Sequence, residues 1–427
     1  VANESYFRVL GGQSLSGEFL VQGAKNAVLK EMAATILATG EHHFYNVPRI
    51  VDVEIMAELL LSMGIKSEWA SIDHLVISTP SADDILPLAD YELVEKIRAS
   101  ITVLGPLIAR LGKAKISMPG GDDFGHRPID MHLEALSELG VKFTSSHGYI
   151  EAEAPSLSSN EISLEFPSHT GTDNVLMAAV LTPGHTIINN AAREPEVIDL
   201  GMMLNSMGAH ISGLGTSTIT VDGVEQLRPA NHIVVPDRID AATAIAAVAM
   251  NRGEVMIRRA RLAHMEMLVR KLKDTGLDFQ IDNDGFVVKA SRRLNAVNIA
   301  TLPYPGIATD YLPLLVSMLA CADGDSIVTE NLFSGRFKYV DELRRLGANM
   351  TTSGHHVAIH GVAFLSGAPV KATDIRAGAA LLVAATAAEG ETRVIGASHI
   401  QRGYQFLAKR LSDLGASVEL VEESKSA

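Results

Sequence analysis

Residues 176–208 read LMAAVLTPGHTIINNAAREPEVIDLGMMLNSMG and contain all parts of a unit that recurs along the chain. The stretch that ends at Gly184 is apolar nearly all round, which is typical of a buried helix packed through small side chains. A short strand (185–189), a polar loop and an amphipathic helix ending at Gly208 follow. Glycine is favoured at the C-terminal end of each of these two helices, because the residue after a helix often adopts the left-handed conformation.

The unit recurs six times. The glycines that end the amphipathic helices are separated by 76, 68, 68, 71 and 68 residues: Gly64, Gly140, Gly208, Gly276, Gly347 and Gly415. A second series ends the alanine-rich helices: Gly40, Gly112, Gly184, Gly253, Gly324 and Gly390. Such a period indicates repeated supersecondary units. We therefore predict an α/β protein with two domains of three units each, in which sheets surround buried helices. The opening residues Tyr6–Val21 fit no unit and are expected to form a strand pair.

Composition restricts the class of protein. The chain has 427 residues, of which 47% are hydrophobic and 20% charged, with a net charge of −14. This charge, without a Lys/Arg cluster, argues against nucleic-acid binding. No secretory signal pattern and no uncharged apolar stretch of about 18 residues is found, so we expect a cytoplasmic protein that does not enter the membrane. Cys321 is the only cysteine, which excludes disulfides and multi-cysteine metal sites, and we expect it to be a buried, inert thiol.

Residues 119–132, PGGDDFGHRPIDMH, combine three glycines with three aspartates, one arginine and two histidines, which is typical of a ligand-binding loop. Glycines allow the backbone to approach a ligand closely, and the guanidinium of Arg127 suits phosphate or carboxylate. Taken alone, the segment could equally be a polar surface loop.

Further polar residues begin the six alanine-rich helices, at 23–26, 96–100, 167–173, 236–240, 309–310 and 373–376. Their Ser, Thr and Asp residues are ordinary N-caps. The cations are different, because they stand at the positive end of a helix dipole, where an anion between cation and helix would be favoured. They are Lys25, Arg98, Arg238 and Arg376. If the helix starts of both domains face one cleft, Asp122, Asp310 and Glu194 are available for proton transfer. This predicts transfer or cleavage chemistry on a multiply anionic substrate.

Competing motifs are absent from the sequence. It holds no GxGxxG after a strand, no GxxxxGK[ST] and no HExxH, and none of its fifteen scattered histidines is expected to be a metal ligand.

Seven segments carry a family resemblance: GAKN (23–26), RAS (98–100), 119–132, NAAREPE (190–196), PDRI (236–239), TDIR (373–376) and RGY (402–404). Together they resemble the UDP-N-acetylglucosamine enolpyruvyl transferases over essentially the whole chain. The related shikimate-pathway transferase lacks the first and third patterns. The resemblance implies a two-domain inside-out α/β barrel of the EPSP synthase-like type. One domain would be 24–236, with a mobile catalytic loop at 118–128, and the other 1–23 plus 237–427, with the active site in the cleft between them.

The resemblance also implies transfer of the enolpyruvyl group of phosphoenolpyruvate to the 3-hydroxyl of UDP-N-acetylglucosamine, an early step of peptidoglycan synthesis, without cofactor or metal. The catalytic residues would be Lys25, Asp122 and Asp310. The phosphoenolpyruvate-binding residues would be Lys25, Arg98, Arg127, Arg376 and Arg402. The nucleotide-sugar contacts would be Asn26, Arg98, Arg127, Pro128, Ile129, Asp130, Met131, His132, Ser168, His169, Thr170, Asp310, Leu332 and Arg336.

Three departures from the family pattern matter. One is Val51, which falls where some members carry a phosphoenolpyruvate-binding lysine, although Arg49 is near enough to substitute. Asp122 stands where most members carry a cysteine that is the general acid and the target of fosfomycin, so we expect an active but fosfomycin-insensitive enzyme. The 168–171 segment, Ser-His-Thr-Gly, replaces the usual Ser-Val-Gly-Ala. This leaves open a specialised paralogue with another nucleotide or sugar acceptor, or a catalytically silent paralogue that binds nucleotide sugar. Intact Lys25, Asp310 and Arg402 favour an enzyme.

Overall fold

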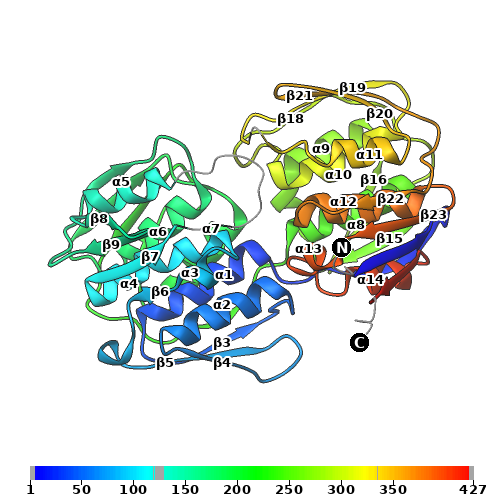
Figure 1. Ribbon diagram of the computed structural model, residues 1–427. Coiled ribbons are helices and arrows are strands. Elements are labelled where there is room, and N and C mark those ends of the chain that lie inside the picture. The colour runs from blue at the N-terminus through cyan, green and yellow to red at the C-terminus, as the bar shows by residue number, and fades with distance from the viewer. Residues whose placement is uncertain (1–4, 119, 121–128, 334, 423–427) are drawn as a thin grey trace. The chain divides into compact units, whose positions relative to one another are not determined.

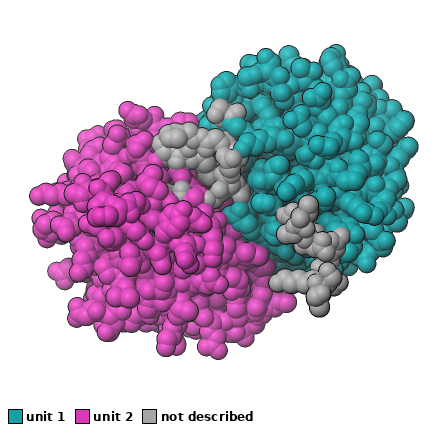
Figure 2. All heavy atoms as spheres, viewed as in Figure 1, with its two compact units in different colours: residues 1–22, 123–126, 236–427 teal, residues 23–122, 127–235 magenta. Residues whose placement is uncertain are grey.

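The structure is a computed structural model that describes residues 5–118, 120, 129–333 and 335–422 (Figure 1). The chain forms two compact units, each with its own hydrophobic core (Figure 2). Unit 1 holds the described residues up to Gln22 and from Pro236 onward, and unit 2 those between Gly23 and Val235. The chain therefore starts in unit 1, builds all of unit 2, and returns.

The described part of the chain contains six four-stranded sheets, three in each unit. Their strands follow the same relative order. In unit 2 they are β14 (Asn231–Ile233), β3 (Gly40–Tyr45), β5 (Leu75–Thr79) and β4 (Lys66–Trp69); β6 (Leu88–Ala89), β7 (Lys113–Ser117), β9 (Tyr149–Glu153) and β8 (Lys142–Ser146); and β10 (Glu161–Ser163), β11 (His185–Asn189), β13 (Thr218–Asp222) and β12 (His210–Ser212). In unit 1 they are β2 (Leu15–Leu20), β15 (Gly253–Arg258), β17 (Gly285–Ala290) and β16 (Asp278–Asp282); β18 (Ile299–Ala300), β19 (Asp325–Thr329), β21 (His356–His360) and β20 (Asn349–Ser353); and β22 (Pro369–Lys371), β23 (Glu391–Ile395), β1 (Tyr6–Leu10) and β24 (Ser417–Val421).

The alanine-rich helices are buried, as predicted. They are α1 (Lys25–Ala34), α4 (Leu104–Leu111), α6 (His169–Ala179), α8 (Arg238–Asn251), α10 (Leu312–Ala320) and α12 (Ile375–Ala387), with 3-10 turns η3 (Arg98–Val103) and η5 (Thr309–Tyr311) leading into α4 and α10. In unit 1, α8, α10 and α12 pack on one another, which the small side chains of α8 and α12 permit. The amphipathic helices are α2 (Val51–Ser62), α5 (Asp130–Glu138), α7 (Pro195–Ser206), α9 (Glu266–Asp274), α11 (Val340–Arg345) and α14 (Leu407–Asp413).

The predicted glycine series are confirmed. All twelve glycines have positive φ angles, between 69° and 127°. Because a side chain strains this backbone conformation, glycine ends each helix and turns the chain into the next strand.

The expected strand pair at Tyr6–Val21 is wrong. β1 pairs antiparallel with β23 and β24, whereas β2 pairs parallel with β15, so the two strands complete different sheets of unit 1. The repeat also has a strand that the sequence reading missed, which runs parallel to the strand after the buried helix. In β6, β10 and β18 this strand has only two or three residues, too few to show a period of two.

Two expectations about exposure can be compared with the structure. Cys321 is partly exposed rather than buried, but burial of its thiol still raises the pKa to about 11, so the thiol stays protonated and inert as expected. Among the described residues, no helix is long and apolar enough to span a bilayer.

Two buried imidazoles make unit 2 sensitive to acid. The Nε2 atom of His42 lies 3.0 Å from the carbonyl oxygen of Ala38, and the amide of Ala230 donates to its Nδ1. Burial lowers the pKa of His42 to about 4, and burial followed by the charge of Arg98 lowers that of His132 to about 4. In the unfolded chain the two imidazoles therefore bind protons near pH 6.5, whereas in the native state they bind them only near pH 4.

We expect the free energy of unfolding to fall as the pH is lowered from about 6.5 to 4, by about 3 kcal/mol for each ring. Urea unfolding at several pH values measures this, and His42→Gln should flatten the profile whereas the exposed-site variant His210→Gln should not. Parallel profiles for the wild type and His42→Gln would contradict the prediction.

Candidate active site

The predicted site residues fall into two sets, one in each unit. Unit 1 carries Asp310, Leu332, Arg336, Arg376 and Arg402; unit 2 carries Lys25, Asn26, Arg98, Ile129, Asp130, Met131, His132, Ser168, His169 and Thr170. Asp122, Arg127 and Pro128, with most of the expected 118–128 loop, lie outside the described residues.

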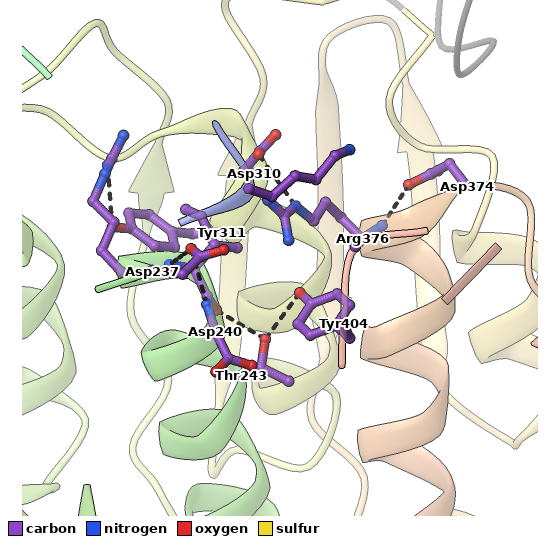
Figure 3. A network of polar contacts seen from close by, with 12 residues as sticks. Asp237, Asp240, Thr243, Asp310, Tyr311, Asp374, Arg376 and Tyr404 are labelled. Carbon is purple, nitrogen blue, oxygen red and sulfur yellow. Dashed lines mark hydrogen bonds and ion pairs between the residues drawn. The ribbon is translucent and has the colours of Figure 1, made fainter. Parts of the chain in front are cut away.

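Asp310 is the centre of the unit 1 set (Figure 3). It lies in η5 at the start of α10, and its Oδ1 and Oδ2 atoms are each 3.2 Å from a guanidinium nitrogen, of Arg336 and Arg376 respectively. The two arginine side chains are 1% and 5% exposed, whereas the carboxylate is 25% exposed. One carboxylate therefore lies between two buried cations, while part of its own surface stays accessible to a ligand.

Arg376 is fixed by the start of α12. The N-cap residue Asp374 accepts hydrogen bonds from the backbone amides of Arg376 and Ala377, at 3.0 and 2.9 Å. The guanidinium lies 5.3 Å from the ring of Tyr404, whose hydroxyl is 3.0 Å from that of Thr243 (Figure 3). Burial alone would lower the pKa of Arg376, but Tyr404 and Asp310 raise it overall, so this cation is permanent.

Glu330 positions the loop that carries Leu332 and was missed by the sequence reading. Its Oε1 atom accepts from the amides of Leu332 and Phe333, at 2.6 and 3.2 Å, and its Oε2 atom accepts from the hydroxyl of Thr309 at 2.7 Å. The side chain is 1% exposed. One buried carboxylate thus fixes both this loop and the turn next to Asp310. The only signal in the sequence was an acidic residue directly after a strand.

In unit 2, Lys25 opens α1 at the positive end of the helix dipole, as predicted. Its Nζ atom lies 2.8 Å from Oδ2 of Asp52 in α2, and the two side chains are 12% and 2% exposed. The ion pair offsets the unfavourable placement of the cation. Asp52 was not predicted, because the partner lies in the outer helix of the same repeat.

His132 is a structural residue in this conformation. The amide nitrogen of Asn174 donates to His132 Nδ1 and to the carbonyl oxygen of Ile101, both at 2.9 Å, and its oxygen accepts from Gly105. The proton of the neutral ring therefore sits on Nε2, 3.3 Å from the hydroxyl of Thr170. The ring joins η3, α5 and the first turn of α6, where the Ser168 hydroxyl accepts from the amide of Gly171.

His169 contacts a buried cation that the sequence reading missed. The Nζ atom of Lys30 lies 2.8 and 3.1 Å from the two ring nitrogens of His169 and 3.1 Å from Oδ2 of Asp173. The side chains of Lys30 and Asp173 are 3% and 0% exposed. Burial raises the pKa of Asp173 to about 6, against the lowering effect of Lys30. The available signal was the charged Lys30–Glu31 pair inside an apolar helix.

Lys30→Met is expected to lower the free energy of unfolding by about 3–5 kcal/mol, because it leaves the buried Asp173 carboxylate without its cation. The double variant Lys30→Met/Asp173→Asn should recover much of the loss. Lys115→Met, which removes an exposed partner of Glu151, should leave unfolding nearly unchanged. Denaturant titration measures all three, and a loss from Lys30→Met as small as that from Lys115→Met would contradict the prediction.

Comparison with known proteins identifies the class. Residues 9–411 match the EPSP synthase (3-phosphoshikimate 1-carboxyvinyltransferase) family. The solved enolpyruvyl transferase NikO from Streptomyces tendae superposes with a TM-score of 0.87 at 23% identity, covering 98% of this chain and 99% of that one. EPSP synthase from Acinetobacter baumannii gives a TM-score of 0.77 at 18% identity, covering 98% and 100%. The fold is thus that of the EPSP synthase-like enolpyruvyl transferases, as predicted.

Closer relatives narrow this class. A UDP-N-acetylglucosamine 1-carboxyvinyltransferase from Mycolicibacterium paratuberculosis is 47% identical over 416 residues, which cover 97% of this chain and 99% of the relative. One from Myxococcus xanthus is 45% identical over 410 residues, covering 96% and 98%. The chain belongs to this family of enolpyruvyl transferases.

Proposed function

We propose that this enzyme transfers the enolpyruvyl group of phosphoenolpyruvate to the 3-hydroxyl of UDP-N-acetylglucosamine and releases phosphate, a step of peptidoglycan synthesis. The relatives named for this reaction match nearly the full chain. The observation that carries the proposal is the Asp310 carboxylate, held between Arg336 and Arg376 yet still partly exposed.

In this mechanism, the 3-hydroxyl oxygen of the sugar attacks C2 of phosphoenolpyruvate, and Asp310 accepts the proton of that hydroxyl. Asp122 donates a proton to the methylene carbon, which gives a tetrahedral intermediate. Loss of a proton from the new methyl group and of phosphate then restores the double bond. Lys25, Arg98, Arg127, Arg376 and Arg402 neutralise the carboxylate and phosphate, whose charge is redistributed as the bonds change.

The nucleotide sugar would be held by residues from both units. Asn26, the segments 127–132 and 168–170, Leu332 and Arg336 would contact it, with Asp310 at its 3-hydroxyl. The substrates would then bind between domains 24–236 and 1–23 plus 237–427. A cytoplasmic location agrees with such substrates and stays a prediction.

Phosphate release from phosphoenolpyruvate tests the proposal, with UDP-N-acetylglucosamine, UMP or shikimate 3-phosphate as the acceptor. We expect turnover with the nucleotide sugar alone. Release with shikimate 3-phosphate alone would refute the acceptor assignment. Binding of UDP-N-acetylglucosamine without any phosphate release would instead support a silent, nucleotide-sugar-binding protein.

A specialised paralogue is the second candidate, and one observation favours it. His169 lies at the start of α6, in the segment that departs from the family pattern. Its ring contacts the buried Lys30 of α1. A fixed ring there would alter the surface offered to the nucleotide. Release with UMP and not with UDP-N-acetylglucosamine would select this candidate.

A further inference from the structure

A second polar cluster lies in unit 2, formed by residues that the reaction does not use. It consists of Glu31 in α1, Asp199 in α7 and His232 in β14. Each offers one ligand atom, and these three atoms lie within 4.8 Å of one another. α1 packs against α7 (Figure 1). Because α7 also packs against β14, the cluster joins three segments that are far apart in the sequence.

Three polar atoms of this cluster, on Glu31 and His232, are buried without a hydrogen bond to any described residue. Glu31 is 0% exposed, and among the described residues neither of its carboxylate oxygens has a hydrogen-bond partner. The Nε2 atom of His232 is also buried without one. Burying a carboxylate in this way is costly unless a cation compensates it.

Two of the distances within the cluster are compatible with a metal site. His232 Nε2 lies 3.2 Å from Asp199 Oδ2 and 3.6 Å from Glu31 Oε1. A charge-assisted N–H···O bond would be about 2.7–2.9 Å long. With zinc–ligand bonds of about 2.0–2.1 Å, neighbouring ligand atoms of a tetrahedral site lie about 3.3 Å apart. These two separations are close to that edge length.

The charges and surroundings agree with this. With a metal ion bound, two carboxylates and a neutral imidazole would sum to −2, which a divalent cation neutralises. The backbone amide of Val235 donates to Asp199 Oδ2 at 2.8 Å, an outer contact that would orient this ligand. The side chains of His232 and Asp199 are 13% and 12% exposed, so water can reach a fourth coordination position.

We propose that Glu31, Asp199 and His232 form a structural site for a divalent transition-metal ion, with Zn²⁺ as the best match to one imidazole and two carboxylates. The metal would tie β14, the last strand of unit 2 before the chain returns to unit 1, to the buried helix α1 and to α7. The site departs from the sequence-based expectation that no histidine is a metal ligand, and it is separate from the transfer reaction.

Zinc binding to the full-length protein, first treated with a chelator and dialysed, tests the proposal. We expect one equivalent of Zn²⁺ by calorimetric titration and elemental analysis, and a higher melting temperature with Zn²⁺. Co²⁺ should give the visible absorption of four-coordinate geometry. His232→Gln should weaken binding by more than about 100-fold, since loss of even an outer partner of a metal ligand costs about 10- to 100-fold.

The matched control is His185→Gln, which removes an exposed histidine beside Asp222 and should leave the titration unchanged. Absence of stoichiometric Zn²⁺ binding to the wild type would overturn the proposal, whatever the variants do, and would mean that the cluster shares protons instead. Unchanged affinity in a folded His232→Gln protein would also overturn it. Phosphate release measured on the same samples keeps this result separate from that for the enzymatic function.

Discussion

Asp310→Asn is expected to reduce the rate of phosphate release at saturating substrates by about 10²- to 10⁴-fold, the usual contribution of a general base. Asparagine preserves the shape of the side chain but cannot accept the hydroxyl proton. The substitution also removes the anion shared by Arg336 and Arg376. Both guanidinium groups become more available to an anionic ligand, so KM for phosphoenolpyruvate should stay the same or fall while kcat drops.

This split between kcat and KM separates a catalytic role from a structural one. If Asp310 only held the two arginines in place, its loss would raise KM for phosphoenolpyruvate. Asp341→Asn is the matched control, because Asp341 pairs with Arg344 in the same unit but is exposed. Melting temperatures of both variants establish that they are folded. Asp310→Asn turnover within tenfold of the wild type would exclude Asp310 as the base.

Asp122→Cys is expected to give an enzyme that fosfomycin inactivates completely with time, in contrast to the insensitivity that we predict for the wild type. A thiolate near the cations predicted for this site is a strong nucleophile toward the epoxide, whereas a carboxylate is a poor one. The wild type should keep its activity during preincubation with the drug. Intact-mass measurement should find one adduct on the variant and none on the wild type.

The companion variant Asp122→Asn tests the predicted proton donor. An amide cannot donate as a carboxylic acid does, so we expect phosphate release to fall by about 10²-fold or more, without fosfomycin sensitivity. A covalent adduct at Asp122 of the wild type would refute the insensitivity, and full activity of Asp122→Asn would refute the proton-donor role. Cys321 provides an internal control, because its protonated thiol should not react.

Much of the fold was predictable because its signals are local. A helix end that requires positive φ selects glycine, as at Gly184 and Gly208, and six repeats of that requirement reveal the units. The burial of helices such as α12 follows from their alanine content. The strands before the buried helices other than α1 were not predictable, because two or three residues show no periodicity. The pairing of β1 and β2 with strands hundreds of residues away leaves no local pattern.

For the candidate site, the sequence by itself determined the residue types and their places at helix starts. Lys25, Arg98 and Arg376 were predicted from charge against the helix dipole and from family resemblance, and Asp310 from its place at a helix start and from the same resemblance. Only the tertiary structure decided which charges meet. Asp310 lies between Arg336 and Arg376, Lys25 pairs with Asp52, and Lys30 lies between His169 and Asp173. The physical reason is that helix propensity and capping act within a few residues, whereas buried charges are compensated by whichever segments the packed repeats bring together.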